Sequence, residues 1–179
     1  MAQQEMIIGG GCFWCVEAAF NEIKGVTSAV SGYCGGDKSD ANYTAVCTKR
    51  TKHVEVVKIT FDDEIIDFKS LLTLFFTVHD ATQIDGQGND IGPQYRSAIF
   101  YQNDEQQAIS LQLIEEINEQ KLFDKAVVTS VEPASEFFIA EDYHQHYYKN
   151  NPEQGYCMAV VAPKFQKFKK QHAALLKSK

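Results

Sequence analysis

The stretch Met6-Ile7-Ile8-Gly9-Gly10-Gly11-Cys12-Phe13-Trp14-Cys15 joins an apolar run to three glycines and then to two cysteines. The residues that follow repeat apolar side chains at helical spacing, namely Val16, Ala19, Phe20 and Ile23. The pattern predicts a strand, a glycine turn and a helix, with Cys12 in the first helical turn. Free N–H groups and the positive end of the helix dipole stabilise a thiolate at that place. We therefore expect Cys12 to react as a thiolate.

The composition is that of a globular protein with one domain. The chain has 179 residues, of which 44% are hydrophobic, and a net charge of -7. An acidic chain does not favour nucleic-acid binding, and its apolar runs are too short to cross a membrane. Its first five residues lack the features of a secretory signal. We expect a single domain over residues 1–179, monomeric and cytoplasmic, with a flexible C-terminal tail from about residue 150.

The chain contains five cysteines, an odd number that argues against a structural disulfide framework in a protein without an export signal. Reactive thiols explain this number better. A zinc-binding module is the alternative, but such a site needs four ligands at recurring short spacings, and only Cys12 and Cys15 form such a pair. Cys34 and Cys47 are interpreted as small packed residues.

Strand-like and helix-like segments alternate irregularly along the rest of the chain. Asp67 is expected to cap the helix that follows it. The predicted strands cover residues 26–33, 54–61, 98–101 and 127–131, and the predicted helices cover residues 68–78, about 104–121 and the basic segment 164–179. Short strands mixed with helices favour an α+β two-layer sandwich, in which helices pack on a mixed or antiparallel sheet. A doubly wound parallel fold is the alternative.

Glu55 shares one face of its predicted strand with apolar residues, because side chains alternate between the two faces of a strand. The other residues of this face are Val57, Ile59 and Phe61. Burial disfavours the charged form of a carboxyl group and raises its pKa, so Glu55 is a candidate general acid. The alternative is a Glu at the strand end that reaches water.

Aromatic and polar residues gather near the predicted turns. Tyr43 and Tyr95 lie beside glycine-bearing turns or loops, where a phenol hydroxyl can donate to a polar oxygen; ordinary packing is the alternative. Residues 81–95 form a long loop with several glycines, which predicts an ordered binding loop. Phe13 and Trp14 adjoin Cys12 and could form a water-poor pocket for an apolar substrate group.

The histidines do not form an evident site. His144 and His146 are two residues apart and cannot chelate a metal together from one face of a helix. A Cys–His pair that uses His53 or His79, as in a thiol protease, leaves a hydrolase open as a further alternative.

Seven blocks of residues, in order from residue 11 to residue 157, match one enzyme family: Gly11-Cys12-Phe13-Trp14, Ser31-Gly32-Tyr33 with Gly35-Gly36, Tyr43 to Cys47, His53-Val54-Glu55-Val56-Val57, Gln87-Gly88-Asn89-Asp90 with Gln94-Tyr95-Arg96-Ser97, Ala140-Glu141-Asp142-Tyr143-His144-Gln145, and Gly155-Tyr156-Cys157. On these blocks the chain resembles the A class of peptide methionine sulfoxide reductases. The resemblance implies a ferredoxin-like α+β core and reduction of the S epimer of methionine sulfoxide, free or in oxidised proteins. It also implies thioredoxin or a dithiol as the reductant, and no metal or organic cofactor.

The resemblance gives each site residue a role. It implies that Cys12 attacks the sulfoxide sulfur while Glu55 protonates the oxygen. The remaining implied roles are hydrogen bonds to that oxygen from Tyr43 and Tyr95, help from Asp90 in holding the substrate or a water, and a place for the S-methyl group against Phe13 and Trp14. Attack would release methionine and leave a sulfenic acid on Cys12, which a second thiol converts to a disulfide.

The resolving thiol is either Cys15 or Cys157. Many relatives carry Gly where Cys15 stands, and its spacing from Cys12 allows a disulfide at a helix start. Cys157 lies in the tail that we expect to be flexible. Cys15 is the favoured added partner, and a relay through both stays open. A thioredoxin-like Cys-x-x-Cys disulfide oxidoreductase is the alternative function, but it leaves Glu55 and the Asp90 loop without a role.

Overall fold

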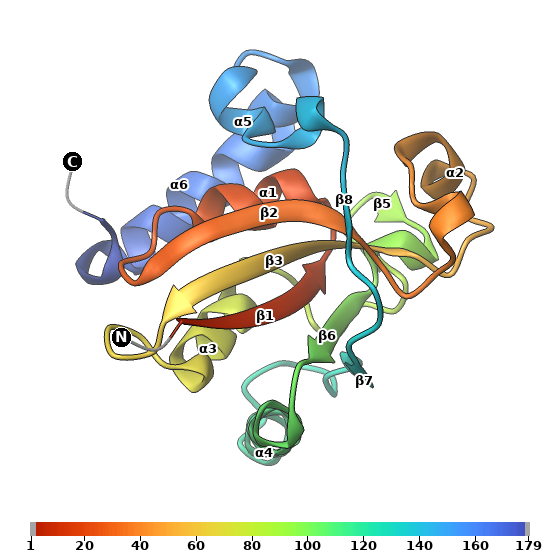
Figure 1. Cartoon of the computed structure of the whole chain (residues 1–179). Coiled ribbons are helices and arrows are strands. Elements are labelled where there is room, and N and C mark those ends of the chain that lie inside the picture. The colour runs from red at the N-terminus through yellow and green to blue at the C-terminus, as the bar shows by residue number, and fades with distance from the viewer. Residues whose placement is uncertain (1–2, 178–179) are drawn as a thin grey trace.

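Strands and helices alternate along residues 3–177, the part of the chain that the computed structural model describes (Figure 1). The strands are β1 (Gln3–Gly10), β2 (Val26–Cys34), β3 (Val54–Asp62), β4 (Gly86–Gln87), β5 (Asp90–Ile91), β6 (Ser97–Tyr101), β7 (Ser130–Pro133) and β8 (Phe138–Ile139). The helices are α1 (Phe13–Phe20), α2 (Tyr43–Cys47), α3 (Phe68–Val78), α4 (Asp104–Glu119), α5 (Tyr147–Asn150) and α6 (Ala162–Gln171), and a π-helix over Cys157–Val161 leads into α6. Residues 1, 2, 178 and 179, which the sequence analysis placed in the single domain, lie outside the described residues.

The central strands have the ferredoxin-like arrangement. β1, α1, β2, β3, α3 and β6 follow one another as β-α-β-β-α-β. The strand order of the main sheet, within the described residues, is β7-β6-β1-β3-β2-β8. β1 is antiparallel to β3 and β6, β2 is antiparallel to β3 and β8, and β7 runs parallel to β6. The sheet is therefore mixed, and the expected α+β fold is confirmed.

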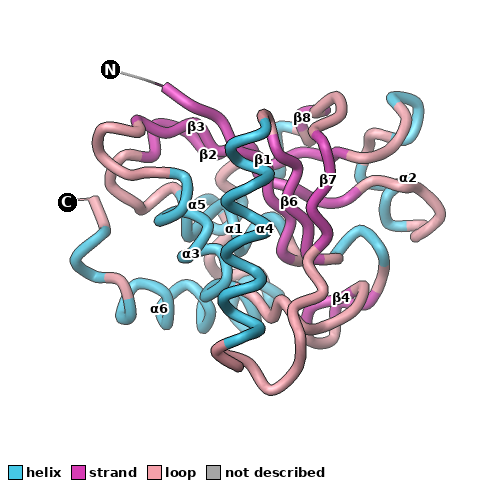
Figure 2. Tube along the Cα trace, turned by 90° about the horizontal axis from the view of Figure 1, so that it is seen from below, coloured by secondary structure: helices cyan, strands magenta, loops and turns pink. Residues whose placement is uncertain are grey.

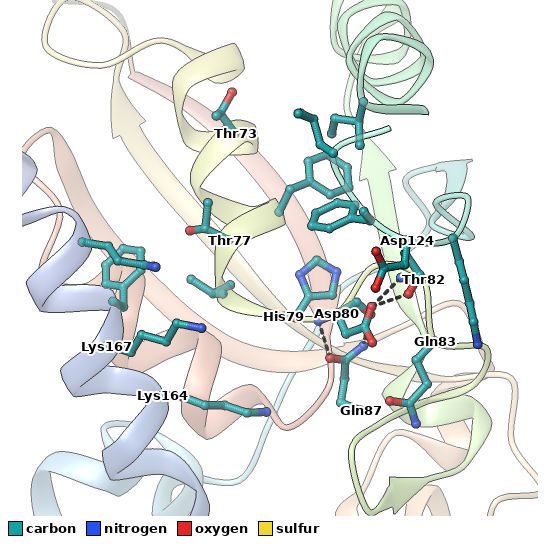
Figure 3. Close-up of a pocket in the computed structure, with 18 of the residues that line it drawn as sticks. Thr73, Thr77, His79, Asp80, Thr82, Gln83, Gln87, Asp124, Lys164 and Lys167 are labelled. Carbon is teal, nitrogen blue, oxygen red and sulfur yellow. Dashed lines mark hydrogen bonds between the residues drawn. The ribbon is translucent and has the colours of Figure 1, made fainter. Parts of the chain in front are cut away.

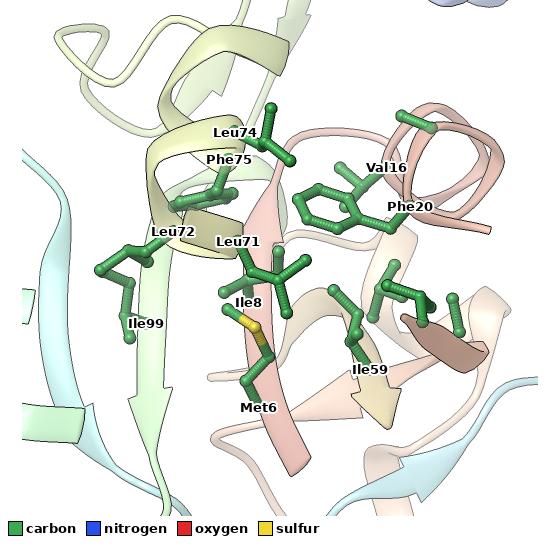
Figure 4. Packing of buried hydrophobic residues seen from close by; sticks show 14 of the residues in the cluster. Met6, Ile8, Val16, Phe20, Ile59, Leu71, Leu72, Leu74, Phe75 and Ile99 are labelled. Carbon is green, nitrogen blue, oxygen red and sulfur yellow. The ribbon is translucent and has the colours of Figure 1, made fainter. Parts of the chain in front are cut away.

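Both faces of the sheet are covered, and this explains why β3 is buried along most of its length. α1 and α3 pack on one face, where Phe20 and Phe75 lie over Ile8 (Figure 4). Figure 2 shows the strands of the sheet gathered on one side of the molecule and helices α1, α3 and α6 on the other. The segment between β7 and β8 covers the opposite face, where Phe137 packs against a smaller apolar cluster that includes Val56. This packing fixes the end of β1 and the start of α1 relative to β3.

The predicted elements agree with the structure except in their ends and in one strand. α3 spans the predicted residues 68–78, and the carboxylate of Asp67 caps it by accepting a hydrogen bond from the Ser70 N–H at 2.8 Å. The strand predicted over 127–131 was misplaced, because β7 begins at Ser130, where its pairing with β6 begins. The N–H of Val128 instead donates to the carbonyl of Ala81 at 2.8 Å.

The C-terminal segment, expected as a flexible tail from about residue 150, is largely helical. Cys157, Val161 and Phe168 are buried, and the ring of Phe168 packs against Phe20 of α1. The basic segment predicted as a helix over 164–179 is α-helical only as far as Gln171, because α6 spans Ala162–Gln171 and a short 3-10 helix follows at Ala173–Leu175; its last two residues lie outside the described part. Mobility of this segment stays a prediction. Within residues 3–177, no helix has the length and apolar character needed to cross a membrane.

Candidate active site

Gly11 and Cys12 form the turn between β1 and α1. Gly11 has a φ of 94°, and a Cβ at this position would lie 2.6 Å from Cγ of Gln87, so both the backbone and the packing require glycine. α1 begins at Phe13, which makes Cys12 the N-cap residue rather than a member of the first turn as predicted. The extended backbone of Cys12, with φ -60° and ψ 123°, explains this difference. Its side chain lies at the positive end of the helix.

Glu55, the second residue of β3, lies beside this turn. Its carboxyl is buried, with 2% of the residue exposed, and Oε1 accepts a hydrogen bond from the backbone N–H of Phe13 at 3.2 Å. Burial raises the pKa of Glu55 to about 8; the Phe13 N–H lowers it, and the nearby charges of Asp90 and Cys15 raise it further. Glu55 therefore holds its proton at neutral pH, and the predicted burial is confirmed.

A cavity of about 260 Å³ opens over Cys12 and Glu55. α2 contributes Tyr43 from its first residue, β5 contributes Asp90, and the turn before β6 contributes Tyr95. Its lining residues are Cys12, Phe13, Trp14, Tyr43, Glu55, Asp90, Tyr95, Gln154 and Tyr156. The structure thus brings together in one cavity all the predicted site residues except the two candidate resolving cysteines.

Three tyrosine hydroxyls and the carboxyl of Asp90 line the cavity. Burial raises the pKa of Tyr43 and of Tyr95, so both phenols keep their protons and can donate hydrogen bonds. The hydroxyl of Tyr156 donates to Oδ2 of Asp90. This contact joins the segment before the π-helix to the β4–β5 hairpin, and both residues line the cavity.

Trp14, the single tryptophan of the chain, forms an aromatic wall of the cavity. Its ring stacks on Tyr147 with a centroid distance of 3.8 Å and an interplanar angle of 8°. Its indole N–H donates to Nδ1 of His144 at 3.0 Å. His144 also lies against the rings of Phe13 and Tyr43, at 5.0 and 4.5 Å between centroids. Two residues of the segment 144–147 therefore fix the orientation of the indole.

The thiols at the start of α1 differ from the expectation. Burial raises the pKa of Cys12, and a hydrogen bond to Cys15 and the nearby Glu55 raise it further, so Cys12 rests as a thiol and not as the predicted thiolate. The pKa of Cys15 is lowered, chiefly by that hydrogen bond from Cys12 and also by Lys164 against the opposing effect of burial. Loss of water around Cys12 outweighs its favourable position at the helix end, so the pKa values of the two neighbouring thiols are shifted in opposite directions.

All five cysteines are free thiols. Cys157 is fully buried at the start of the π-helix, where burial raises its pKa, while Cys15 is partly exposed. Cys34 is buried near Ser135, as expected, whereas the expected packing of Cys47 is wrong: Cys47 is exposed at the end of α2, a short helix that buries Val46 instead. Of the two candidate resolving thiols, only Cys15 combines a lowered pKa with access to the surface.

His53 and His79 are committed to structural hydrogen bonds. His53 accepts from the Gly36 N–H at Nδ1 and donates to the Asp37 carbonyl from Nε2. His79 contacts the Phe75 carbonyl through Nδ1 and the Ser97 hydroxyl through Nε2. Burial lowers the pKa of His79 to about 4. Neither ring lines the cavity with Cys12, so the structure does not form the Cys–His pair of a thiol hydrolase.

Several residues that complete the cavity were not predicted from the sequence. Gln154 and Tyr156 lie in the segment that we expected to be a flexible tail. His144 and Tyr147 support Trp14 from a segment whose histidines were judged not to form a site. For Tyr156, the available signal in the sequence was an aromatic residue directly before a cysteine, Cys157. His144 and Tyr147 lie more than 100 positions from Trp14 in the sequence, so no local pattern predicts their contacts with it.

A larger cavity of about 970 Å³ lies between α3, the end of α4 and α6 (Figure 3). Gln87 lies at its edge and clamps the backbone of Asp80, with its amide oxygen on the N–H at 2.7 Å and its amide nitrogen on the carbonyl at 2.6 Å. No cysteine lines this cavity among residues 3–177, and Lys164 and Lys167 extend into it from α6. Of these two cavities, only the smaller one has a cysteine, Cys12, among its described lining residues. Within the described chain, no cluster of three or more His, Cys, Asp or Glu side chains could hold a metal ion.

Comparison with known proteins identifies one family. The family model described as peptide methionine sulfoxide reductase matches residues 4–176. The peptide methionine sulfoxide reductase MsrA of Deinococcus radiodurans is 47% identical over 176 residues, which cover 98% of this chain and 85% of that protein.

Solved structures agree with this match. Reduced Mxr1 from Saccharomyces cerevisiae superimposes with a TM-score of 0.79 at 30% identity, covering 87% of this chain and 89% of that one. Methionine sulfoxide reductase A of Corynebacterium diphtheriae gives 0.75 at 34% identity, with coverages of 88% and 78%. Mxr1 in complex with Trx2 aligns less closely, with a TM-score of 0.55 at 20% identity and coverages of 81% and 84%, and supports the fold alone.

Proposed function

Because this chain belongs to the peptide methionine sulfoxide reductase family and reduces methionine sulfoxide with thiols, we propose that the reduction takes place in the 260 Å³ cavity with Cys12 as the nucleophile. The observation that carries this proposal is the meeting of Cys12 with a buried, protonated Glu55 in one cavity. In disulfide exchange the leaving group is a thiolate, which can depart without being protonated first. A sulfoxide needs an acid, because its oxygen leaves only after protonation.

Glu55 is proposed as the general acid. Its pKa of about 8 keeps the proton available at neutral pH, and the Phe13 N–H fixes the carboxyl beside the start of α1. The sulfur of Cys12 attacks the substrate sulfur while the sulfoxide oxygen takes up a proton. Overall, the Cys12 thiol and the sulfoxide give a Cys12 sulfenic acid and methionine, and Glu55 regains its proton by the end of the step.

The substrate is proposed to be held by polar contacts on one side and aromatic contacts on the other. The phenols of Tyr43 and Tyr95 keep their protons and can donate to the sulfoxide oxygen. Asp90 helps to hold the substrate or a water through its place in the same lining. The S-methyl group lies against Phe13 and Trp14, where little water competes.

Cys15 is proposed as the resolving thiol. It lies three residues after Cys12 in the first turn of α1, and the lowered pKa of its thiol favours the nucleophilic form that attacks a sulfenic acid. The Cys15 sulfur displaces the sulfenic hydroxyl of Cys12, which forms a disulfide and releases water. Cys157 is fully buried, so its participation requires the helical segment around it to move.

Thioredoxin is proposed as the reductant of the resulting disulfide. The related Mxr1 has been solved in complex with Trx2, and a Cys12–Cys15 disulfide would lie at a partly exposed site. Two thiols of the reductant are then oxidised to a disulfide, and Cys12 and Cys15 return to free thiols. No metal or organic cofactor is proposed. The cytoplasm, where thiol reductants are maintained, is the proposed location, and the chain is proposed to act as one catalytic domain.

A single-turnover experiment tests the proposed function. Fully reduced protein is mixed with one equivalent of methionine S-sulfoxide, and in parallel with the R epimer, and released methionine is measured without added reductant. We expect close to one methionine per chain from the S epimer and little from the R epimer. Release of methionine by a Cys12→Ser variant at the wild-type rate would contradict the assignment of Cys12.

A further inference from the structure

Glu17 is a buried carboxyl that the proposed chemistry does not use. It lies on α1 with 2% of the residue exposed, and burial raises its pKa to about 7. It follows Trp14 by three positions, and residues three apart lie on the same face of a helix. The carboxyl does not line the catalytic cavity, whereas Trp14 does. A buried acid next to a cavity wall requires a structural or positioning reason.

The partner of Glu17 is the backbone of the segment that supports Trp14. Oε1 of Glu17 accepts a hydrogen bond from the His146 N–H at 2.9 Å. His146 has φ 53° and ψ 35°, a left-handed conformation that residues with a Cβ rarely adopt. This bond therefore helps to hold a strained backbone conformation, next to the hydrogen bonds that join the Gln145 side chain to the Ser31 backbone.

His144, two residues before His146, and Tyr147, directly after it, both contact the indole. His144 accepts its N–H, and Tyr147 stacks on its face. The left-handed turn at His146 lets both side chains face Trp14. A change at this turn would release the two contacts together, although neither involves Glu17.

We propose that Glu17 is a positioning residue, which holds the segment 144–147 against Trp14 and so fixes the aromatic wall of the cavity. The proposal rests on the proposed function only for the claim that Trp14 receives the substrate methyl group. Either protonation state of Glu17 presents an oxygen to the His146 N–H, so a Gln at this position keeps the contact and an apolar side chain of similar length loses it.

The test compares Glu17→Met with Glu17→Gln, and uses Ile117→Ala, a truncation of a buried residue on α4, as the control for a general loss of stability. The first readout is the fluorescence of Trp14 in the substrate-free protein, which needs no catalysis. For Glu17→Met we expect emission at longer wavelength and easier quenching by acrylamide, because the indole loses its cover. Glu17→Gln and Ile117→Ala should both keep the wild-type spectrum.

The second readout separates binding from chemistry. The aromatic wall contacts the substrate and the transition state equally, so its loss weakens binding and does not slow the chemical step. For Glu17→Met we therefore expect KM to rise about tenfold, while the first-turnover rate at saturation stays within about threefold of the wild-type rate. Glu17→Gln should restore the wild-type KM. A folded Glu17→Met protein with wild-type fluorescence and KM would overturn the proposal, and so would a Gln variant that fails to restore both.

If Glu17→Met does not fold, hydrogen exchange tests whether Glu17 restrains the backbone at His146. The His146 amide should then be strongly protected in the wild-type protein and remain protected in Glu17→Gln. Rapid exchange of this amide in the folded wild-type protein would refute the restraint. If the fluorescence results hold while KM does not change, Glu17 positions Trp14 but the role of Trp14 in the proposed function is wrong.

Discussion

Replacing Glu55 by Gln removes the proton that the cavity holds and keeps the size of the side chain. The carboxyl is buried with 2% of the residue exposed, and its pKa is raised to about 8 by that burial. In the unfolded chain the same group ionises near its ordinary pKa of 4.5. Between these two pH values the folded protein retains a proton that the unfolded chain has released.

The sign and size of the stability effect follow from this difference. Because the folded state binds more protons, the free energy of unfolding of the wild type falls as pH rises from 4.5 towards 8. At about 1.36 kcal/mol per pH unit, the contribution of Glu55 over this interval is about 5 kcal/mol. The contribution is fully present below the unfolded-state pKa and is lost once pH exceeds the folded-state value. Glu55→Gln has no such proton, so it gains stability relative to the wild type as pH rises.

Urea unfolding of both proteins between pH 5 and pH 9, followed by circular dichroism, measures this difference. We expect the curves of unfolding free energy against pH to diverge by several kcal/mol, with the Gln variant becoming relatively more stable at high pH. The variant should also reduce methionine sulfoxide about 10² to 10⁴ times more slowly in the first turnover, because general acid catalysis is lost. Parallel stability curves, or an unchanged first-turnover rate, would refute the reasoning.

Three further predictions concern the turn before α1 and the thiols. Cys12→Ser should abolish methionine release in single-turnover assays, because a hydroxyl cannot take up the oxygen as a sulfenic acid; residual turnover at more than a small fraction of the wild-type rate would speak against it. Cys15→Ser should keep the first turnover and accumulate a sulfenic acid that a dione probe labels on Cys12, whereas Cys157→Ser should form the disulfide normally, so the reverse pattern would assign resolution to Cys157. Gly11→Ala should lower the free energy of unfolding in urea by about 1–3 kcal/mol, because it combines a φ of 94° with a Cβ 2.6 Å from Gln87, and an unchanged value would show that the turn adapts.

Much of the fold follows from local patterns. The apolar spacing and the capping Asp67 gave α3 its ends, since a helix that packs on one face and is capped by its own sequence depends on nearby residues. The strand at β7 was misplaced because its start depends on the pairing of Ser130 with Ala98 on β6, about thirty residues away. The ferredoxin-like order came from the family resemblance rather than from periodicity.

The site was predictable only where a local sequence pattern marked its residues. Alternation along β3 showed that Glu55 shares an apolar face, and the structure adds that its carboxyl reaches the Phe13 N–H. The protonation of Cys12 was predicted wrongly, because the helix position argues for a thiolate while burial, which only the folded structure reveals, argues against it. Glu17 and His146 are 129 positions apart, so their contact left no local signal.

Mass spectrometry of the disulfides after one equivalent of methionine S-sulfoxide tests the central claim most directly. The reduced protein is treated without reductant, its remaining thiols are alkylated, and the peptides that contain each cysteine are mapped. We expect one methionine released per chain and a Cys12–Cys15 disulfide, with Cys34, Cys47 and Cys157 alkylated. Alkylated Cys12 after methionine has been released, or a disulfide that does not include Cys12, would contradict the account.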